Sequence, residues 1–266
     1  MKENSVALIT GASYGIGYEF AKILAGMGIN LILVSRSYEK LLEVKKELEE
    51  RYSVGITVIP LDLSLKDSAE VLFQKCEEKD LNIDILINNA GIGLFGKNIE
   101  NSIEDIERLI FLNILTPTKL CRLFGEKMAQ RGSGDILNLG SMGSLIPFPF
   151  FAVYSATKSY ILSLSISIRS ELKDYGVNVS CLLPGFVKTH FDDNSKIASE
   201  RYKAFSKRAG MDAARVAEIG IKALFKKKAF VIPGIVNKAL SIIIKVIPPT
   251  LLTEIVKSSV KRLTKG

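Results

Sequence analysis

Residues 6–17 have the sequence VALITGASYGIG, which is the most informative segment for the fold. A short apolar run leads directly into three glycines, and a segment of helical period follows them. Glycine there permits a tight turn, close approach of a ligand and close packing of a helix on a strand. Backbone N–H groups and the positive helix end would then receive the pyrophosphate of a dinucleotide. The residues expected at this site are Gly11, Ser13, Tyr14, Gly15, Ile16 and Gly17.

Apolar runs and segments of helical period alternate along the chain, which is typical of βαβ units around a parallel sheet. We therefore predict an α/β fold, a doubly wound Rossmann sheet of about seven parallel strands with helices on both faces. The strands are expected at 5–10, 31–35, 55–61, 83–88, 135–139 and 177–183, with a candidate seventh at 229–232. The helices are expected at 15–27, 38–52, 68–79, 102–130, 152–175 and 212–227.

Length and charge indicate one domain over residues 1–235 with a basic extension over 236–266. The polar segment 190–211 lacks a clear strand and is predicted to be a mobile insertion over the site. The net charge is +8, and the whole excess lies in 226–266, which has nine basic residues and one acidic residue. No nucleic-acid-binding motif accompanies it, so a membrane surface or an acidic ligand suits it better than DNA.

The C-terminal stretch VNKALSIIIKVIPPTLLTEIVKSSVKRL, residues 236–263, is apolar and basic at once. Pro248 and Pro249 interrupt it, so it is unsuited to span a bilayer as one helix. Two amphipathic helices could lie on a membrane, cover a neighbouring subunit or roof a pocket. We favour packing on protein over peripheral membrane contact, because apolar helical stripes are most often buried against protein.

Cysteine and histidine usage argues against disulfide and metal chemistry. Cys76, Cys121 and Cys181 stand far apart without a CxxC pair, and His190 is the only histidine. We interpret the cysteines as buried reduced thiols and His190 as a loop residue, and we expect no metal site. The apolar run near the N-terminus is too short for a signal peptide or membrane anchor, so a cytoplasmic protein is expected.

The end of the second predicted strand indicates which nucleotide binds. An acidic residue there would accept both ribose hydroxyls of NAD, but Ser35 and Arg36 occupy this place. Arg36 can pair with the 2′-phosphate of NADP, so NADP(H) is predicted unless Arg36 is only a solvated charge. Ser13 could bind the same phosphate or only stabilise its turn. Asp62 and Leu63 could contact adenine, although a cap on the next helix would also explain Asp62.

Tyr154 and Lys158 stand four residues apart in YSATK, so a helix places them on one face. A nearby ammonium stabilises a phenolate and moves the phenol pKa from about 10 toward a value useful at neutral pH. The pair alone occurs by accident in many helices. Ser141, thirteen residues before Tyr154, closes the fifth predicted strand, where its hydroxyl can polarise a carbonyl.

In order and approximate spacing, these residues resemble the short-chain dehydrogenase/reductase family. The resemblance rests on TGASYGIG at 10–17, NNAG at 88–91, Asn113, Ser141, Tyr154, Lys158 and the pair Pro184–Gly185. It covers residues 5–190 closely and the remainder weakly. It implies an oxidoreductase that transfers a hydride between NADP(H) and a carbonyl or secondary alcohol. A non-catalytic NADP(H)-binding sensor or scaffold is the alternative.

The same resemblance implies residue roles. Tyr154 would donate the proton in reduction, Ser141 would orient the carbonyl, and Lys158 would hold the nicotinamide ribose and tune the tyrosine. Asn113 would distort its helix and help hold a proton-relay water, unless it is an ordinary buried amide. Further nucleotide contacts would come from Asn89, Ala90, Gly91, Pro184, Gly185, Val187 and Thr189. Family members usually associate through two long helices, so a homodimer or homotetramer is expected.

Three phenylalanines lie between Ser141 and Tyr154, where the family builds one wall of its substrate pocket. They are Phe148, Phe150 and Phe151, of which Phe148 and Phe151 are the predicted substrate contacts. The predicted substrate is an apolar ketone, such as a 3-oxoacyl or hydroxysteroid-like compound. Packing in the core or between subunits would explain each phenylalanine about as well.

Overall fold

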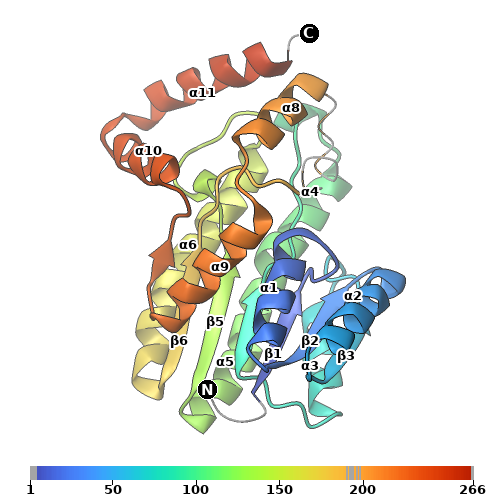
Figure 1. Ribbon diagram of the computed structural model, residues 1–266. Coiled ribbons are helices and arrows are strands. Elements are labelled where there is room, and N and C mark those ends of the chain that lie inside the picture. Colours follow the sequence, from blue (N-terminus) through green and yellow to red (C-terminus); the bar gives the residue numbers. More distant parts are fainter. Residues whose placement is uncertain (1–4, 190, 192–194, 196, 198, 265–266) are drawn as a thin grey trace.

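Seven parallel strands form one sheet in the computed structural model of this chain (Figure 1), in the order β3-β2-β1-β4-β5-β6-β7. The structure describes residues 5–189, 191, 195, 197 and 199–264. The strands are β1 (Val6–Thr10), β2 (Asn30–Ser35), β3 (Ile56–Pro60), β4 (Ile85–Asn88), β5 (Gly134–Leu139), β6 (Val177–Leu182) and β7 (Phe230–Val231). The predicted Rossmann sheet and all seven predicted strands are confirmed.

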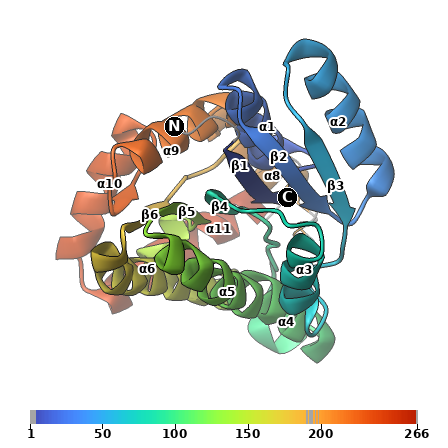
Figure 2. The same ribbon diagram turned by 90° about the horizontal axis from the view of Figure 1, so that it is seen from below.

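Two helical layers enclose the sheet, as Figure 2 shows from below. Apolar side chains of α1, α2 and α9 pack against one face, and those of α3, α5 and α6 pack against the other. The two cores explain why the strands are apolar throughout, since both of their faces are buried. The helices of these layers are α1 (Gly15–Gly26), α2 (Tyr38–Arg51), α3 (Ser68–Glu77), α5 (Thr116–Arg131), α6 (Ala152–Leu172) and α9 (Ala213–Phe225).

The strand order reverses at the centre of the sheet, where β1 lies beside β4. The chain leaves these two strands in opposite directions, which opens a crevice at their carboxyl ends. Thr10 ends β1 and Asn88 ends β4, so the glycine turn and the NNAG motif both lie at this crevice. Open α/β sheets bind their ligands at such a place.

The helix predicted over 102–130 is present, with a distortion in its middle. The chain forms α4 (Ile103–Ile110), a π-helical segment (Phe111–Leu115) and then α5. Asn113 lies in the π-helical segment, so the distortion that the family resemblance implied at this residue is present. One wider turn hardly alters the spacing of apolar residues, which is why the sequence pattern did not reveal the break.

The sequence analysis assigned no helix to 190–211, but Glu200–Ala209 form α8. Its first turn is capped by Ser199, whose Oγ accepts a hydrogen bond from the backbone N–H of Tyr202 at 3.2 Å. After α8, Met211 forms a parallel bridge with Val187. Residues 190, 192–194, 196 and 198 of the predicted insertion lie outside the described residues.

The basic extension forms the two expected helices, α10 (Ile235–Val246) and α11 (Pro249–Thr264). Figure 1 shows both, together with α8, beyond the carboxyl ends of the strands. Helix α11 packs on the protein, since Leu252 and Val260 are buried and the Ser199 hydroxyl donates to the Leu263 carbonyl at 2.9 Å. Among the described residues, no helix is long and apolar enough to cross a membrane.

Candidate active site

The turn between β1 and α1 requires glycine at specific positions. Gly11 and Gly15 have φ of +67° and +61°, which side chains rarely tolerate. A Cβ on Gly17 would overlap the carbonyl oxygen of Gly11 and lie 2.5 Å from Nδ2 of Asn89. Within the described structure, the Tyr14 side chain does not cap the first turn of α1, and that turn has no acidic residue. Its N–H groups can therefore bind an anion.

Asn89 ties the end of β4 to this turn. Its Nδ2 donates hydrogen bonds to the carbonyl oxygens of Thr10 at 2.9 Å and Gly11 at 3.0 Å. In return, the Thr10 hydroxyl accepts the backbone N–H groups of Asn89 and Ala90, each at 3.0 Å. These bonds fix the two strand ends that border the crevice.

Two of the predicted nucleotide residues follow β2 and β3. Arg36 is exposed just beyond β2. Burial raises the pKa of Asp62, but hydrogen bonds from Ser64 and the charges of Arg108 and Arg36 outweigh it and lower that pKa overall. The alternative that Asp62 caps the next helix is wrong, because Asp67 occupies the N-cap position of α3. Asp62 instead accepts both the backbone N–H and the hydroxyl of Ser64, at 2.9 and 2.6 Å.

The side chain of Leu63 is less exposed to solvent than that of Asp62. Its side chain is buried in the core between the sheet and α3. Its carbonyl oxygen accepts the Thr116 hydroxyl at 2.7 Å.

Lys158 is a buried cation behind the ring of Tyr154. Both residues belong to α6, and the Lys158 Nζ lies 5.8 Å from the ring centre. The lysine is only 4% exposed, and its Nζ donates a hydrogen bond to the Leu139 carbonyl at 2.8 Å. Burial lowers the pKa of Lys158 to about 8. An ammonium at this place stabilises negative charge on the tyrosine oxygen.

Ser141 lies near the tyrosine ring, just beyond the end of β5. Its Oγ accepts the backbone N–H of Gly143 at 3.0 Å. A Cβ on Gly143 would lie 3.4 Å from that Oγ and 3.8 Å from Cε1 of Tyr154. The hydroxyl and the ring therefore border the same small space, in which a carbonyl oxygen could contact both.

Asn113 approaches the same centre from the π-helical segment. Its amide pairs with the backbone of Ile92, accepting the N–H at 3.0 Å and donating to the carbonyl at 2.9 Å. It also donates to the Thr157 hydroxyl at 3.2 Å. A Cβ on Gly91 would lie 3.3 Å from the Asn113 Oδ1 and 3.4 Å from the Lys158 Nζ. Asn113 is thus a satisfied buried amide that also lies near Lys158.

The segment after β6 closes the crevice from the side of α9 and α10. The Thr189 Cγ2 lies 3.1 Å from the place where a Cβ on Gly15 would be. Pro184 and Gly185 follow β6 directly, and Gly185 faces Asn237 of α10, whose Nδ2 would lie 2.8 Å from an added Cβ. Of the predicted nucleotide residues in this segment, Thr189 thus lies beside the glycine turn, and Gly185 lies against α10.

Aromatic side chains surround Tyr154. The ring centre of Phe151 lies 5.8 Å from that of Tyr154 and 5.7 Å from that of Phe148. Phe191 lies 5.4 Å from Tyr154, and Tyr202 of α8 lies 6.3 Å from Phe151. The two predicted substrate residues are thus part of an aromatic cluster that borders the tyrosine.

Five of the nine described members of this aromatic cluster were not predicted from the sequence. The additional members are Phe95, Phe186, Phe191, Tyr202 and Phe205. Phe95 follows β4 and Phe186 follows β6, so position after a strand end was a usable signal. Tyr202 and Phe205 could be placed only once α8 was recognised.

Phe150 has an unusual backbone. Its φ is +68°, a value that costs a residue with a side chain about 1 kcal/mol or more. Its carbonyl accepts the Gly96 N–H at 2.9 Å, and its ring centre lies 6.0 Å from that of Phe95. These contacts hold the loop between Ser141 and Tyr154 against the segment after β4.

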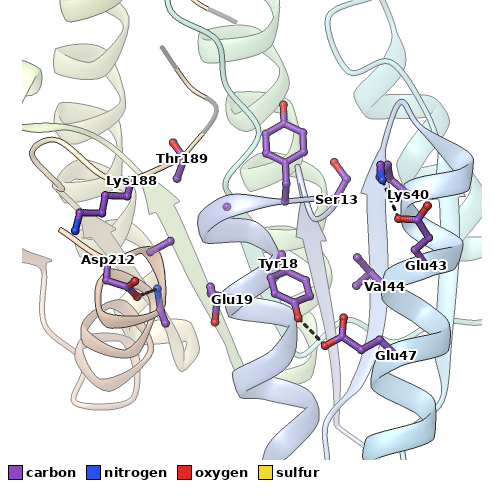
Figure 3. Close-up of a pocket in the computed structure, with 14 residues that line it drawn as sticks. Ser13, Tyr18, Glu19, Lys40, Glu43, Val44, Glu47, Lys188, Thr189 and Asp212 are labelled. Carbon is purple, nitrogen blue, oxygen red and sulfur yellow. Dashed lines mark hydrogen bonds and ion pairs between the residues drawn. The ribbon is translucent and has the colours of Figure 1, made fainter. Parts of the chain in front are cut away.

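A groove of about 420 Å³ lies at the outer side of the glycine turn (Figure 3). Tyr18 of α1 points toward α2 there, and its hydroxyl donates to Glu47 at 2.6 Å. The groove is lined by Ser13, Tyr14, Gly15, Tyr18, Glu19, Lys40, Glu43, Val44, Glu47, Lys188, Thr189, Asp212, Ala213 and Ala214. It includes four predicted nucleotide residues but not Tyr154, so it adjoins the phosphate end of the crevice and is separate from the reacting centre.

Cysteine and metal chemistry take no visible part in this site. The three cysteines are buried free thiols, as predicted. Among the described residues, no group of three or more histidine, cysteine, aspartate or glutamate side chains could hold a metal ion. His190 lies outside the described residues.

Sequence comparisons identify the family of this chain and several relatives. A family model described as short chain dehydrogenase matches residues 5–200. The very-long-chain 3-oxoacyl-CoA reductase of Rattus norvegicus is 35% identical over 187 residues, which are 69% of this chain and 59% of that protein. The chain thus spans less than two thirds of the length of this relative.

Solved structures with this fold include two proteins that are close in shape. A short-chain dehydrogenase from Sphingobium yanoikuyae in complex with NADPH has a TM-score of 0.81 at 28% identity, over 92% of this chain and 96% of the other. A bulky-bulky ketone specific alcohol dehydrogenase from Comamonas testosteroni has a TM-score of 0.77 at 29% identity, over 93% of this chain and 96% of the other.

The buried charge of Lys158 predicts a pH dependence of stability. The pKa of Lys158 is about 8 in the folded protein and 10.5 in its ordinary, unfolded state. At pH values between these two, Lys158 binds more protons in the unfolded chain than in the folded one, so raising the pH favours folding. The free energy of unfolding of the wild type, minus that of Lys158→Met, should rise by roughly 2 kcal/mol from about pH 7 to about pH 9.5. Urea unfolding without nucleotide measures this difference.

Lys173→Met is the matched control, because this exposed lysine lies just beyond the end of the same helix. It should leave the pH dependence of the wild type unchanged. A Lys158→Met difference that stays constant with pH would contradict the assignment of a buried ammonium.

Proposed function

Because the chain belongs to the short-chain dehydrogenase family, we propose that it transfers a hydride between NADP(H) and a carbonyl or secondary alcohol carbon. One observation carries the proposal: the buried Lys158 ammonium lies behind the Tyr154 ring, with Ser141 bordering that ring beside Gly143. Desolvating an ammonium costs several kcal/mol, and nucleotide binding alone does not require the combination of Lys158 with Tyr154 and Ser141. The non-catalytic sensor is therefore the weaker alternative.

The crevice suits a dinucleotide, because its glycines let the segments that border it pack closely around the first turn of α1, whose N–H groups can bind phosphate. A Cβ on Gly15, Gly17 or Gly91 would meet a neighbouring atom within 3.3 Å. We propose that the glycine turn holds the pyrophosphate, and that Asn89 to Gly91 and Pro184 to Thr189 border the remainder. Asp62 and the backbone of Leu63 would contact adenine. When bound, NADPH supplies the hydride that adds to the carbonyl carbon.

Arg36 supports NADP(H) over NAD(H). Its guanidinium is exposed beyond β2 and can form a bidentate pair with a 2′-phosphate. Ser35 stands where an acidic residue would otherwise accept the ribose hydroxyls. The relative from Sphingobium yanoikuyae, in complex with NADPH, agrees with this preference.

Tyr154 moves the proton. In reduction its phenol O–H donates to the carbonyl oxygen and transfers the proton as the carbon gains the hydride. The Lys158 ammonium stabilises the phenolate that remains, and the Ser141 hydroxyl donates a second hydrogen bond to the same oxygen. In the reverse direction the phenolate accepts the proton of the alcohol. Asn113 would act through Lys158 by helping to hold a relay water.

The aromatic cluster favours an apolar substrate. Phe148 and Phe151 would contact it, and Phe191 lies against Tyr154 on the same side as the cluster. Removing apolar substrate surface from water contributes about 25 cal/mol per Å². We propose a long or bulky ketone, such as a 3-oxoacyl or hydroxysteroid-like compound. The names of the relatives, which specify a very-long-chain 3-oxoacyl-CoA and a bulky-bulky ketone, support this class.

We further propose that the protein is a cytoplasmic homodimer or homotetramer. Its single Rossmann domain would span residues 1–235, with 190–211 as the substrate insertion and 236–266 as an extension of the same domain. Helix α8, within that insertion, packs Tyr202 against Phe151 and so supports its position at the substrate.

Tyr154→Phe tests the mechanism. Removing the phenol oxygen should lower kcat by about 10²-fold or more, because the proposed proton donor is lost. Steady-state NADPH oxidation with a ketone measures the loss, and fluorescence titration with NADPH should show nucleotide affinity within about threefold of the wild type. Tyr160→Phe, in the same helix, should keep wild-type activity. Full activity in Tyr154→Phe would refute the assigned proton donor.

Arg36→Ala tests the cofactor preference. The KM for NADPH should rise by about tenfold or more, while the KM for NADH should change little, because only NADPH carries the 2′-phosphate. Arg122→Ala, at an exposed arginine of α5, should alter neither value. Equal use of both nucleotides by the wild type would overturn the NADP(H) preference.

Substrate preference tests the aromatic pocket. The wild type should have kcat/KM at least about tenfold higher for a long-chain or steroidal ketone than for a small polar ketone. Phe148→Ala should reduce that preference, whereas Phe230→Ala, at an exposed aromatic residue of β7, should not. A preference for small polar ketones would remove the proposed substrate class while leaving the oxidoreductase assignment in place.

A further inference from the structure

Helix α10 turns its apolar side chains away from the protein. The exposed fraction is 85% for Ile235, 68% for Ile242 and 79% for Val246, and Val236 and Ile243 are also exposed. These five residues form the α10 outer face. A surface helix of a globular protein usually does the reverse and directs its apolar stripe inward.

Two polar residues of α10 face the protein. Ser241 is buried and donates to the Lys238 carbonyl at 2.7 Å, one turn earlier in the same helix. Asn237 donates to the Pro233 carbonyl at 2.8 Å, just before the helix begins, and lies against Gly185, beside the crevice. This orientation of α10 leaves its outer face exposed.

The charge around this face is strongly positive. Lys238 and Lys245 are both exposed, and a spacing of seven residues places them along one edge of the helix. Helix α10 contains no acidic residue, and residues 226–266 contain nine basic residues against one acidic residue. An apolar face with a basic edge matches the boundary between the acyl chains and headgroups of an anionic bilayer.

A second copy of the chain fits this face less well. A symmetric contact through α10 would bring the lysine edges of two copies toward each other. No acidic residue on either helix could offset that repulsion.

We propose that the α10 outer face docks on an anionic lipid surface. The helix lies in the plane of the membrane, with Ile235, Ile242 and Val246 entering the boundary of the acyl region. Lys238 and Lys245 contact lipid phosphates along the edge.

Docking through α10 would place the bilayer next to the substrate site. Leu263 of α11 packs against the cluster that contains Phe151 and Tyr202, and α10 and α11 lie at the same end of the molecule (Figure 1). An apolar ketone dissolved in the bilayer would then lie near the pocket. This consequence rests on the proposed function, but docking itself does not.

Vesicle sedimentation tests the proposal. The purified full chain is mixed with vesicles of phosphatidylcholine alone, or of phosphatidylcholine with phosphatidylglycerol, without substrate. We expect binding to the anionic vesicles that is at least about tenfold tighter than to the neutral ones and that weakens with salt. Since no turnover is measured, failure of this test is distinct from failure of the proposed function.

Two variants separate the apolar and electrostatic contributions. The first is a triple variant that combines Ile235→Ser, Ile242→Ser and Val246→Ser. It should weaken vesicle binding by about tenfold or more, because the apolar face is removed. The second is a double variant that combines Lys238→Gln and Lys245→Gln, and it should weaken vesicle binding by about tenfold. The matched controls are Ile99→Ser with Ile103→Ser, and Lys75→Gln with Lys173→Gln, which change exposed residues elsewhere and should bind like the wild type.

Two results would overturn the proposal. One is equal binding, or no binding, to the two kinds of vesicle. The other is a smaller assembly of the triple serine variant in light scattering, which would assign the α10 outer face to a contact between copies. Unchanged unfolding in urea and unchanged NADPH binding show that each variant is folded.

Discussion

The protein has to hold the ammonium group of Lys158 in its interior, and much of the site depends on that constraint. The Leu139 carbonyl at the end of β5 accepts a hydrogen bond from it, and Gly91 leaves the space that a side chain would fill. Burial lowers the pKa of Lys158 to about 8, so the group keeps most of its charge near neutral pH. Helix α6 places Tyr154 one turn earlier, with the centre of its ring 5.8 Å from the Lys158 Nζ.

The topology of the sheet brings the nucleotide crevice to this cation. Because β4 returns beside β1, the Asn89 amide can bond the carbonyls that end β1, and Gly91 then lies between Asn113 and Lys158. Glycines allow close packing along this line, of Gly17 against Gly11 and Asn89 and of Gly91 against Asn113 and Lys158. The phosphate end and the reacting end of the crevice are thus joined by one set of strand ends.

Local patterns in the sequence predicted most of this arrangement. The seven apolar strands, the glycine turn and the Tyr154–Lys158 pair each carry a short-range signal, and the structure places them as expected. The break at Phe111–Leu115 was visible only through the family resemblance, because a π-helical turn barely disturbs apolar spacing. The contact between Tyr202 and Phe151 joins distant segments, so nothing local revealed it. The outward direction of α10 was also hidden, because a helical wheel gives the apolar side of a helix but not what covers it.

The proposed site moves a hydride to an apolar carbonyl carbon while Tyr154 supplies the proton. Incubating the protein with a bulky ketone and NADPH deuterated at the transferable C4 position, and analysing the alcohol by mass spectrometry, tests this reaction. We expect one deuterium on the carbinol carbon of the alcohol and ordinary hydrogen on its oxygen in normal water. Tight NADPH binding with no deuterated alcohol from any apolar ketone would contradict it and favour a nucleotide-binding protein without turnover.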